Sequence, residues 1–293
     1  MLTFDPHRPR RSVLYVPASN ERAMAKASGL AADTIILDLE DAVAPDQKAR
    51  ARQSVLAMLR SGQFIGTEVV VRVNGLATQE IAADVAVAVH ADAVLVPKID
   101  SALDIARCEA ALDASAPDRR VGLWAMIETP RAVLSIAEIC AEAERPAARL
   151  SCLVVGTNDL AKDARVAIVP GRAPLLSWMS QCVLAARAYG LVVLDGVFND
   201  VRDADGFAAE CRQGRELGFD GKTLIHPAQI GPANALYGPS EAEIAAASAV
   251  VEAFARPENA GKGVIVVDGR MTERLHLDMA QRVLAGASAY GAR

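Results

Sequence analysis

Short runs of hydrophobic residues alternate along the chain with longer segments in which apolar residues recur at helical spacing. Eight of these runs are nearly continuous in apolar residues, as expected for strands that are buried on both faces of a parallel sheet. We expect these strands at residues 12–16, 34–39, 68–73, 93–97, 122–127, 152–155, 191–194 and 223–225. The segments between them, such as NERAMAKASGLA, are rich in alanine and have the periodicity of helices.

Eight strands that are each followed by a helix predict a TIM (β/α)8 barrel rather than a doubly wound sheet. We place this catalytic barrel at residues 1–238. Residues 239–293 have a different pattern and predict a small C-terminal helical extension, which starts with a capping box formed by Ser240 and Glu243. After that helix we expect a linker, RPENAGKG, then a short strand, VIVVDG, and a last helix, LHLDMAQRVLAGA.

Composition excludes several classes of protein. The chain has 293 residues with 31 basic and 36 acidic side chains, so it lacks the basic excess of a nucleic-acid-binding protein. The five cysteines are odd in number and never spaced as C-x-x-C, which is typical of reduced thiols in a cytoplasmic protein. Neither a signal peptide nor an apolar run long enough for a membrane span is visible. We therefore expect a cytoplasmic protein with no nucleic-acid or membrane partner.

Polar residues follow nearly every predicted strand. In a TIM barrel the active site lies at these carboxyl ends of the strands. The residues there include Asp38, Glu40, Asp41, Arg72, Asn74, Lys98, Glu128, Thr129, Asp159, Asp195 and His226. The convergence of acids with Arg72 and Lys98 on one rim predicts a site for an anionic substrate and a metal ion.

Glu128 and Asp159 each have an ordinary alternative explanation, as an acid at a helix N-terminus or as a helix cap. As a pair on neighbouring strands, they would supply two oxygens to one hard cation such as Mg²⁺. Arg72 lies between valines in VVVRVNG and needs a carboxylate or a developing oxyanion as its partner. Phosphate-loop, dinucleotide-binding and G-x-S-x-G motifs are absent; GFDGKT fails as a phosphate loop because Glu216 stands where its first glycine is needed.

Several segments resemble the HpcH/HpaI aldolase family, in its citrate lyase β-subunit-like branch. They are RRSVLYVPASNERAMAKASGLAADTIILDLEDAVAPDQKARAR, VVVRVNG, AVLVPKI, AMIETPRAV, VVGTNDLAKD and LGFDGKTLIHPAQI, in that order over nearly the whole chain. The resemblance implies a TIM barrel with a C-terminal extension that assembles as a homotrimer or hexamer. It also implies a Mg²⁺ cofactor and carbon–carbon bond chemistry on acyl thioesters such as citryl-ACP, malyl-CoA or citramalyl-CoA.

Carried over by position, the resemblance makes Glu128 and Asp159 the metal ligands and Arg72 the arginine that contacts substrate. Glu128 would also contact the substrate through the metal. Glu40 and Asp41 match family acids that support the site, and we add Lys98 at the neighbouring strand end to this supporting group.

Two further residues complete the expected site. Arg11, with Arg8 and Arg10, would meet CoA phosphates or the substrate carboxylate, or would belong to a solvated tail. Glu273 occupies the position of the aspartate in the family's G-x-M-[IV]-D tail motif, an acid/base candidate that comes from the neighbouring subunit. Here the tail reads DGRMTER, so a longer carboxylate replaces that aspartate.

The sequence therefore predicts a Mg²⁺-dependent carbon–carbon lyase that cleaves a 3-hydroxyacyl thioester into an acetyl-type thioester and a 2-oxo acid. One alternative is a class II aldolase that acts on a free 2-oxo acid. The other is a non-catalytic acyl-CoA-binding homologue or a subunit of a lyase complex, which the altered tail would favour.

Overall fold

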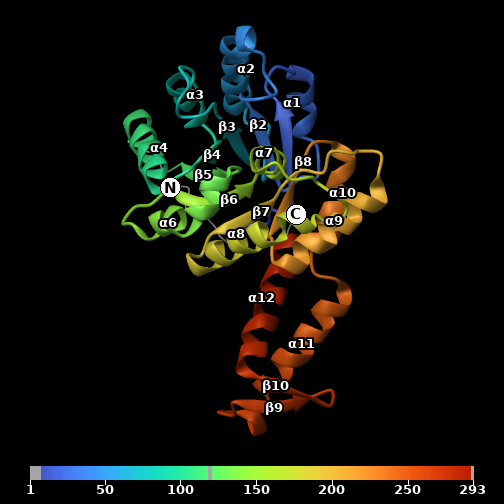
Figure 1. The fold of residues 1–293 in the computed structure, drawn as a ribbon. Helices are drawn as coiled ribbons and strands as arrows, with labels where there is room; N and C mark the ends of the chain where they lie inside the picture. Colours follow the sequence, from blue (N-terminus) through green and yellow to red (C-terminus); the bar gives the residue numbers. More distant parts are fainter. Residues whose placement is uncertain (1–7, 118–120, 292–293) are drawn as a thin grey trace. The chain divides into compact units, whose positions relative to one another are not determined.

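The computed structural model describes residues 8–117 and 121–291, and the chain divides into two compact units (Figure 1). Of the described residues, the first unit holds Arg10–Asn234, and the second holds residues 8–9 and those from Ala235 on. Among the described residues, no helix combines the length and apolar character that a membrane span requires.

The first unit is a closed barrel of parallel strands in the order of the sequence, with β1 paired to both β2 and β8. This confirms the predicted TIM barrel, and each strand overlaps its predicted run. The strands are β1 (Ser12–Pro17), β2 (Thr34–Asp38), β3 (Glu68–Arg72), β4 (Ala93–Val96), β5 (Gly122–Ile127), β6 (Leu150–Val155), β7 (Val192–Asp195) and β8 (Gly221–Leu224).

Helices connect successive strands and surround the barrel, as Figure 1 shows for α1 to α4. They are α1 (Glu21–Ala27), α2 (Lys48–Arg60), α3 (Ile81–Ala88), α4 (Ala102–Ser115), α5 (Pro130–Leu134), α6 (Ile136–Ala141), α7 (Thr157–Ala164), α8 (Leu176–Ala188) and α9 (Ala204–Leu217). A further helix, α10 (Ile230–Tyr237), follows β8 and continues from the first unit into the second. Because helices cover the outer face while side chains fill the interior, both faces of each strand are buried, which explains the nearly continuous apolar runs.

The barrel interior is packed and closed at its amino-terminal end. Its apolar cluster includes Ile36, Val70, Leu95, Trp124, Val154 and Leu194. Below this cluster the Arg10 guanidinium donates from Nε and Nη2 to the two carboxylate oxygens of Glu68, at 2.7 Å each. This buried, bidentate ion pair neutralises charge at the barrel floor.

A second buried ionic cluster lies beside the carboxyl end of β7. Lys222 Nζ is 3.0 Å from Asp195 Oδ2 and 2.7 Å from Glu210 Oε1, and Arg172 Nη1 is 2.7 Å from Asp195 Oδ1. Burial would raise the pKa of Asp195, but Lys222 and Arg172 hold this pKa below its ordinary value. Asp195 therefore stays ionised in the interior, where a charge persists only when it is paired.

The second unit is built from α11 (Glu241–Ala255), β9 (Val264–Val267), β10 (Arg270–Glu273) and α12 (Arg274–Gly291). The predicted capping box is confirmed, because Ser240 Oγ accepts from the Glu243 N–H and the Glu243 carboxylate accepts from the Ser240 N–H. A core of Ala253, Phe254 and Ile265 joins α11 to the hairpin of β9 and β10.

Residues 256–263, expected as a linker, contain a short 3₁₀ helix (Pro257–Asn259) and connect α11 to β9 inside this unit. The sequence predicted β9 and α12 but not β10. The strand RMTE has only one large apolar residue, so periodicity gives it no signal.

Candidate functional site

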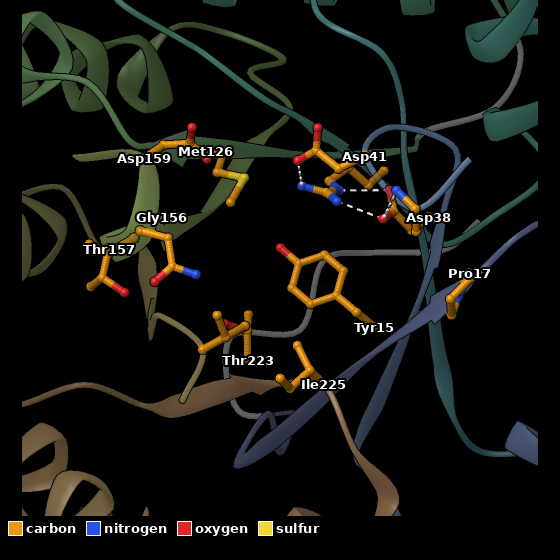
Figure 2. Close-up of a pocket in the computed structure, with 15 residues that line it drawn as sticks. Tyr15, Pro17, Asp38, Asp41, Met126, Gly156, Thr157, Asp159, Thr223 and Ile225 are labelled. Atoms are coloured by element: carbon orange, nitrogen blue, oxygen red, sulfur yellow. Dashed lines mark hydrogen bonds and ion pairs between the residues drawn. The ribbon is translucent and has the colours of Figure 1, made fainter. Parts of the chain in front are cut away.

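A cavity of about 360 Å³ opens at the carboxyl ends of the barrel strands (Figure 2). Its lining includes Tyr15, Pro17, Asp38, Asp41, Ala42, Arg72, Met126, Val155, Gly156, Thr157, Asn158, Asp159, Val197, Thr223 and Ile225. This is the end of the barrel at which TIM-barrel enzymes place their active sites. Figure 2 shows Asp38 and Asp41 on one side of the cavity, Gly156, Thr157 and Asp159 on another, and Tyr15 between them.

Arg72, the last residue of β3, is held by the last residue of β2. Its Nε and Nη2 donate to the two carboxylate oxygens of Asp38 at 2.7 Å and 2.6 Å. Its Nη1 lies 2.9 Å from Glu40 Oε2 and 3.4 Å from Asp41 Oδ2. The carboxylate partner that a buried arginine requires is therefore Asp38, and the remaining Nη hydrogens face the acids at the cavity rim.

The Arg72 guanidinium stays protonated and positively charged. Although burial lowers the pKa of its guanidinium, the hydrogen bonds and charge of Asp38 raise it above the ordinary value. The Arg72 Cζ also lies 4.9 Å from the ring centroid of Tyr15, a cation–π contact that fixes the plane of the guanidinium. Arg72 is thus a rigid cation in the cavity wall.

Glu40 and Lys98 lie next to Arg72 at the ends of β2 and β4. Burial raises the pKa of Glu40 to about 7, and its acidic neighbours Asp41 and Asp38 add to the rise while Arg72 and Lys98 oppose it. Lys98 Nζ is 3.8 Å from Glu40 Oε1. The structure therefore brings these two predicted supporting residues together with Arg72.

Lys98 adopts a backbone conformation that is rare for a residue with a side chain, with φ at 55°. In this conformation its backbone N–H donates to Glu128 Oε1 at 2.8 Å. The strained backbone is thus used to aim a fixed dipole at a carboxylate, as is common at functional sites.

Glu128 and Asp159 lie on neighbouring connections, after β5 and in the first turn of α7. Glu128 is only 2% exposed. Burial raises the pKa of Glu128 to about 7, the nearby negative charges of Glu40 and Asp159 raise it further, and Lys98 opposes the rise. A set of carboxylates that repel one another in a buried wall is the environment that a hard cation relieves.

The donor set fits a divalent metal that keeps open positions. Within residues 8–117 and 121–291, no group of three or more His, Cys, Asp or Glu side chains is arranged to hold a metal ion. Mg²⁺ commonly takes only one or two protein carboxylates and fills its other positions with water and substrate oxygens. Glu128 and Asp159 therefore fit as a two-carboxylate site.

Arg11 lies at the opposite end of the barrel from Arg72. It directly precedes β1, and its Nε and Nη2 donate to the two oxygens of Asp33, just before β2, at 2.8 Å and 2.9 Å. The structure therefore places Arg11 away from this cavity, and its predicted contact with the substrate or CoA stays a prediction. The sequence position could have shown this, because a residue that directly precedes a strand lies at the amino end of the barrel, opposite the carboxyl ends that carry the site.

Glu273 ends β10 in the second unit, where its backbone N–H donates to His276 Nδ1 at 3.0 Å. Its role as an acid/base group stays a prediction.

Sequence reasoning missed Tyr15 and Thr223 as cavity residues because they lie within strands rather than after them. An available signal was strand alternation. Tyr15 lies two residues before Pro17 and so shares its face of β1, which is the face that reaches the cavity.

Comparison with known proteins finds similar chains over nearly the whole length of this one. A model of the HpcH/HpaI aldolase/citrate lyase family matches residues 11–227. The (3S)-malyl-CoA thioesterase of Cereibacter sphaeroides is 48% identical over 286 residues, which cover 97% of this chain and 96% of that protein. The citrate lyase β subunit of Leuconostoc mesenteroides subsp. cremoris is 34% identical over 290 residues, with coverage of 96% and 94%.

Among solved structures, protein CitE of Mycobacterium tuberculosis in complex with magnesium, acetoacetate and coenzyme A aligns with a TM-score of 0.76 and 29% identity. The alignment covers 96% of this chain and 99% of that one. These similarities confirm the family resemblance seen in the sequence motifs.

Proposed function

The chain belongs to the HpcH/HpaI aldolase/citrate lyase family, and from this premise we propose that it is a Mg²⁺-dependent enzyme that hydrolyses the CoA thioester of a small 3-hydroxy dicarboxylic acid of the malyl type. The observation that carries the proposal is that Asp159 and Arg72 line one cavity, while the buried Glu128 lies near enough to Asp159 for that charge to raise its pKa. The choice of hydrolysis rests on the 48% identity to (3S)-malyl-CoA thioesterase over nearly the full length of both chains.

Glu128 and Asp159 would hold the metal. The raised pKa of Glu128 supports this, because it reflects uncompensated negative charge in a buried wall, and the similar CitE protein was solved with magnesium. When bound, Mg²⁺ supplies Lewis-acid polarisation and a template for the oxygens of the hydroxy acid.

In the hydrolysis, a water oxygen bonds to the thioester carbon and the carbon–sulfur bond breaks. The sulfur leaves with the bond's electron pair and takes up a proton, so the products are the free dicarboxylic acid and the CoA thiol. Arg72, held rigid by Asp38 and Tyr15, places its positive charge in the cavity wall, where it would stabilise the negative charge that develops on the thioester oxygen. Met126, Val155 and Val197 narrow the cavity and so limit the size of the acyl group.

The second candidate is carbon–carbon cleavage of the same substrate, the reaction that the sequence motifs predict. The similarity to citrate lyase β subunits, 34% over 290 residues, favours it. Here a base removes the proton of the 3-hydroxyl group, the carbon–carbon bond breaks to leave a 2-oxo acid, and the electron pair enters the thioester as an enolate. Arg72 would face the same oxygen, so the site geometry serves both reactions.

Product analysis separates the two candidates. The purified protein is incubated with (3S)-malyl-CoA with and without Mg²⁺. Release of malate and free CoA thiol supports hydrolysis, whereas glyoxylate and acetyl-CoA indicate carbon–carbon cleavage. Turnover of a free 4-hydroxy-2-oxo acid in place of the thioester would reject both.

Gly156 gives a prediction about the metal site. A Cβ at this position would lie 2.5 Å from Glu128 Cβ and 2.8 Å from Glu128 Oε2, so alanine must displace the carboxylate. We expect Gly156→Ala to lower Mg²⁺-dependent activity by about 10²-fold, the cost of a misplacement near 1 Å. Activity measured against Mg²⁺ concentration tests this. Gly75→Ala is the control, because no heavy atom lies within 4 Å of its added Cβ, and normal activity in both variants would contradict the assignment.

Glu273 is proposed as the base that takes the proton from the attacking water, brought by the second unit of a neighbouring subunit in a homotrimer or hexamer. Removing its charge in Glu273→Gln should lower kcat by about 10²-fold, within the range for one general acid–base group, with KM nearly unchanged. Mixed oligomers with an Arg72 variant should regain partial activity, because some sites then combine an intact barrel with an intact tail. Normal kcat in Glu273→Gln alone would reject the role.

A further inference from the structure

In the buried cluster of Asp195, Lys222, Arg172 and Glu210, two members also bind the backbone of a single residue, Gly196, at its N–H and at its carbonyl oxygen. The Asp195 carboxylate accepts from the N–H of Gly196 at 2.8 Å. Lys222 Nζ donates to the carbonyl oxygen of the same residue at 2.5 Å. Asp195 and Lys222 are both fully buried. The position of Gly196, directly after β7, is therefore fixed from both sides by charged groups.

Gly196 is in turn packed closely against the start of α7. A Cβ on Gly196 would lie 2.4 Å from Thr157 Oγ1, 2.9 Å from Thr157 Cγ2 and 2.7 Å from the Val155 carbonyl oxygen. Only a glycine permits this approach, so the Gly196 backbone is packed directly against Thr157. Thr157 is the first residue of α7, and Asp159 lies in the first turn of the same helix.

Thr157 also connects the cluster to the cavity wall. Figure 2 shows Gly156, Thr157 and Asp159 along one side of the cavity. The Gly156 backbone is packed against the Glu128 carboxylate, because a Cβ on Gly156 would lie 2.8 Å from Glu128 Oε2. A shift of the Gly196 backbone would therefore move the segment that carries Asp159 and supports Glu128.

We infer that Asp195 and Lys222 are positioning residues for the metal site. They hold the Gly196 backbone, which packs against Thr157 and so positions Asp159 in the same helix. The inference rests on the proposed assignment of Glu128 and Asp159 as metal ligands. Residues that orient metal ligands without touching the metal commonly change its affinity by about 10-fold to 100-fold when they are replaced. Asp195 and Lys222 offer this kind of support to the proposed metal ligands, and they are buried groups that take no direct part in the proposed reaction.

The test is Asp195→Asn, measured by calorimetric titration with MgCl₂ at a temperature where the variant is folded. We expect the affinity for Mg²⁺ to fall by about 10-fold or more, because an amide side chain bonds Lys222, Arg172 and the Gly196 N–H less firmly. Saturating Mg²⁺ should restore most of kcat in turnover assays. Lys222→Met, which frees the Gly196 carbonyl oxygen, should lower the Mg²⁺ affinity in the same way.

Two controls separate positioning from loss of stability or of charge. Glu68→Gln weakens the buried ion pair with Arg10 at the barrel floor, so it should lower Tm and leave Mg²⁺ affinity unchanged. Glu210→Gln removes a negative charge from the same cluster at a side chain that pairs with Arg172 and Lys222, and it too should preserve Mg²⁺ affinity.

The outcomes are distinguishable from failure of the metal assignment. If Glu128→Gln keeps normal Mg²⁺ affinity, the metal site itself is wrong. If Glu128→Gln loses Mg²⁺ while folded Asp195→Asn and Lys222→Met bind it as tightly as the native protein, only the positioning role is overturned. Equal loss of affinity in Glu68→Gln would overturn it as well, since the effect would then follow stability.

Discussion

Glu128→Gln is expected to lose nearly all Mg²⁺-dependent turnover while the barrel stays folded. Glutamine keeps the shape of the side chain and an oxygen that accepts from the Lys98 N–H, which lies 2.8 Å from Glu128 Oε1. It removes the negative charge that a hard cation requires. Lewis-acid stabilisation by a metal is worth several kcal/mol, so we expect kcat/KM to fall by about 10³-fold or more.

The stability of this variant provides an independent check. Because burial, Glu40 and Asp159 raise the pKa of Glu128 to about 7, its ionised form is unfavourable in the metal-free protein. Replacing the carboxyl with a neutral amide should therefore leave the Tm of the metal-free protein unchanged or raise it. Mg²⁺ should raise the Tm of the native protein but not that of the variant.

Thermal melts with and without MgCl₂ measure both effects, and Glu138→Gln serves as the control. Glu138 is exposed in α6, so its change should alter neither Mg²⁺ binding nor turnover. Native turnover and a native response to Mg²⁺ in Glu128→Gln would remove Glu128 from the metal site.

The fold was predictable because its signals are local. Each barrel strand is a short apolar run, and every predicted run overlaps an observed strand. The positions of Glu128 and Asp159 at the carboxyl ends of the strands were predictable because polar residues that follow the apolar runs stand out against them. The strand β10 was not predicted because RMTE carries no alternation of apolar and polar residues, and its pairing with β9 is visible only in the folded structure.

Ionic partners could not be predicted, because they depend on register and on which end of the barrel a residue occupies. The register between β2 and β3 places Asp38 opposite Arg72, which gives that arginine its carboxylate. Arg11 illustrates the opposite case. A basic stretch near the N-terminus fits an anionic substrate in sequence, but in the structure Arg11 binds Asp33 at the amino end of the strands. The charge of Arg11 alone did not show that it lies at the end of the barrel opposite the cavity.

Arg72 pairs with buried carboxylates and also lines the cavity, so the choice of substitution decides what an experiment reports. Arg72→Ala would leave Asp38 and Glu40 buried without their cation, and breaking a buried pair in this way costs about 3–5 kcal/mol of stability. Lost activity in that variant would not separate catalysis from unfolding. Arg72→Lys keeps a positive charge beside both carboxylates and is the more informative change.

We expect Arg72→Lys to lower kcat/KM by about 10²–10³-fold, the range for loss of one oxyanion donor. A lysine ammonium cannot make the bidentate contact with Asp38 and also direct further donors to the thioester oxygen, because it lacks the planar fork of the guanidinium. It also loses the contact of the guanidinium with the Tyr15 ring, at 4.9 Å. The loss should appear mainly in kcat, since the charge on the thioester oxygen develops in the transition state.

Arg10→Lys is the matched control, because Arg10 makes the same bidentate contact with Glu68 at the floor of the barrel and also lies over an aromatic ring, that of Trp124. Both substitutions should lower the free energy of unfolding by similar amounts, since each replaces a buried bidentate pair by a single contact. Only Arg72→Lys should lower kcat/KM, because only Arg72 lines the cavity. If Arg10→Lys lost activity to the same extent, the effect of Arg72 would be one of stability. If Arg72→Lys kept native kcat/KM while its Tm fell, Arg72 would be a structural partner of Asp38 with no part in the reaction.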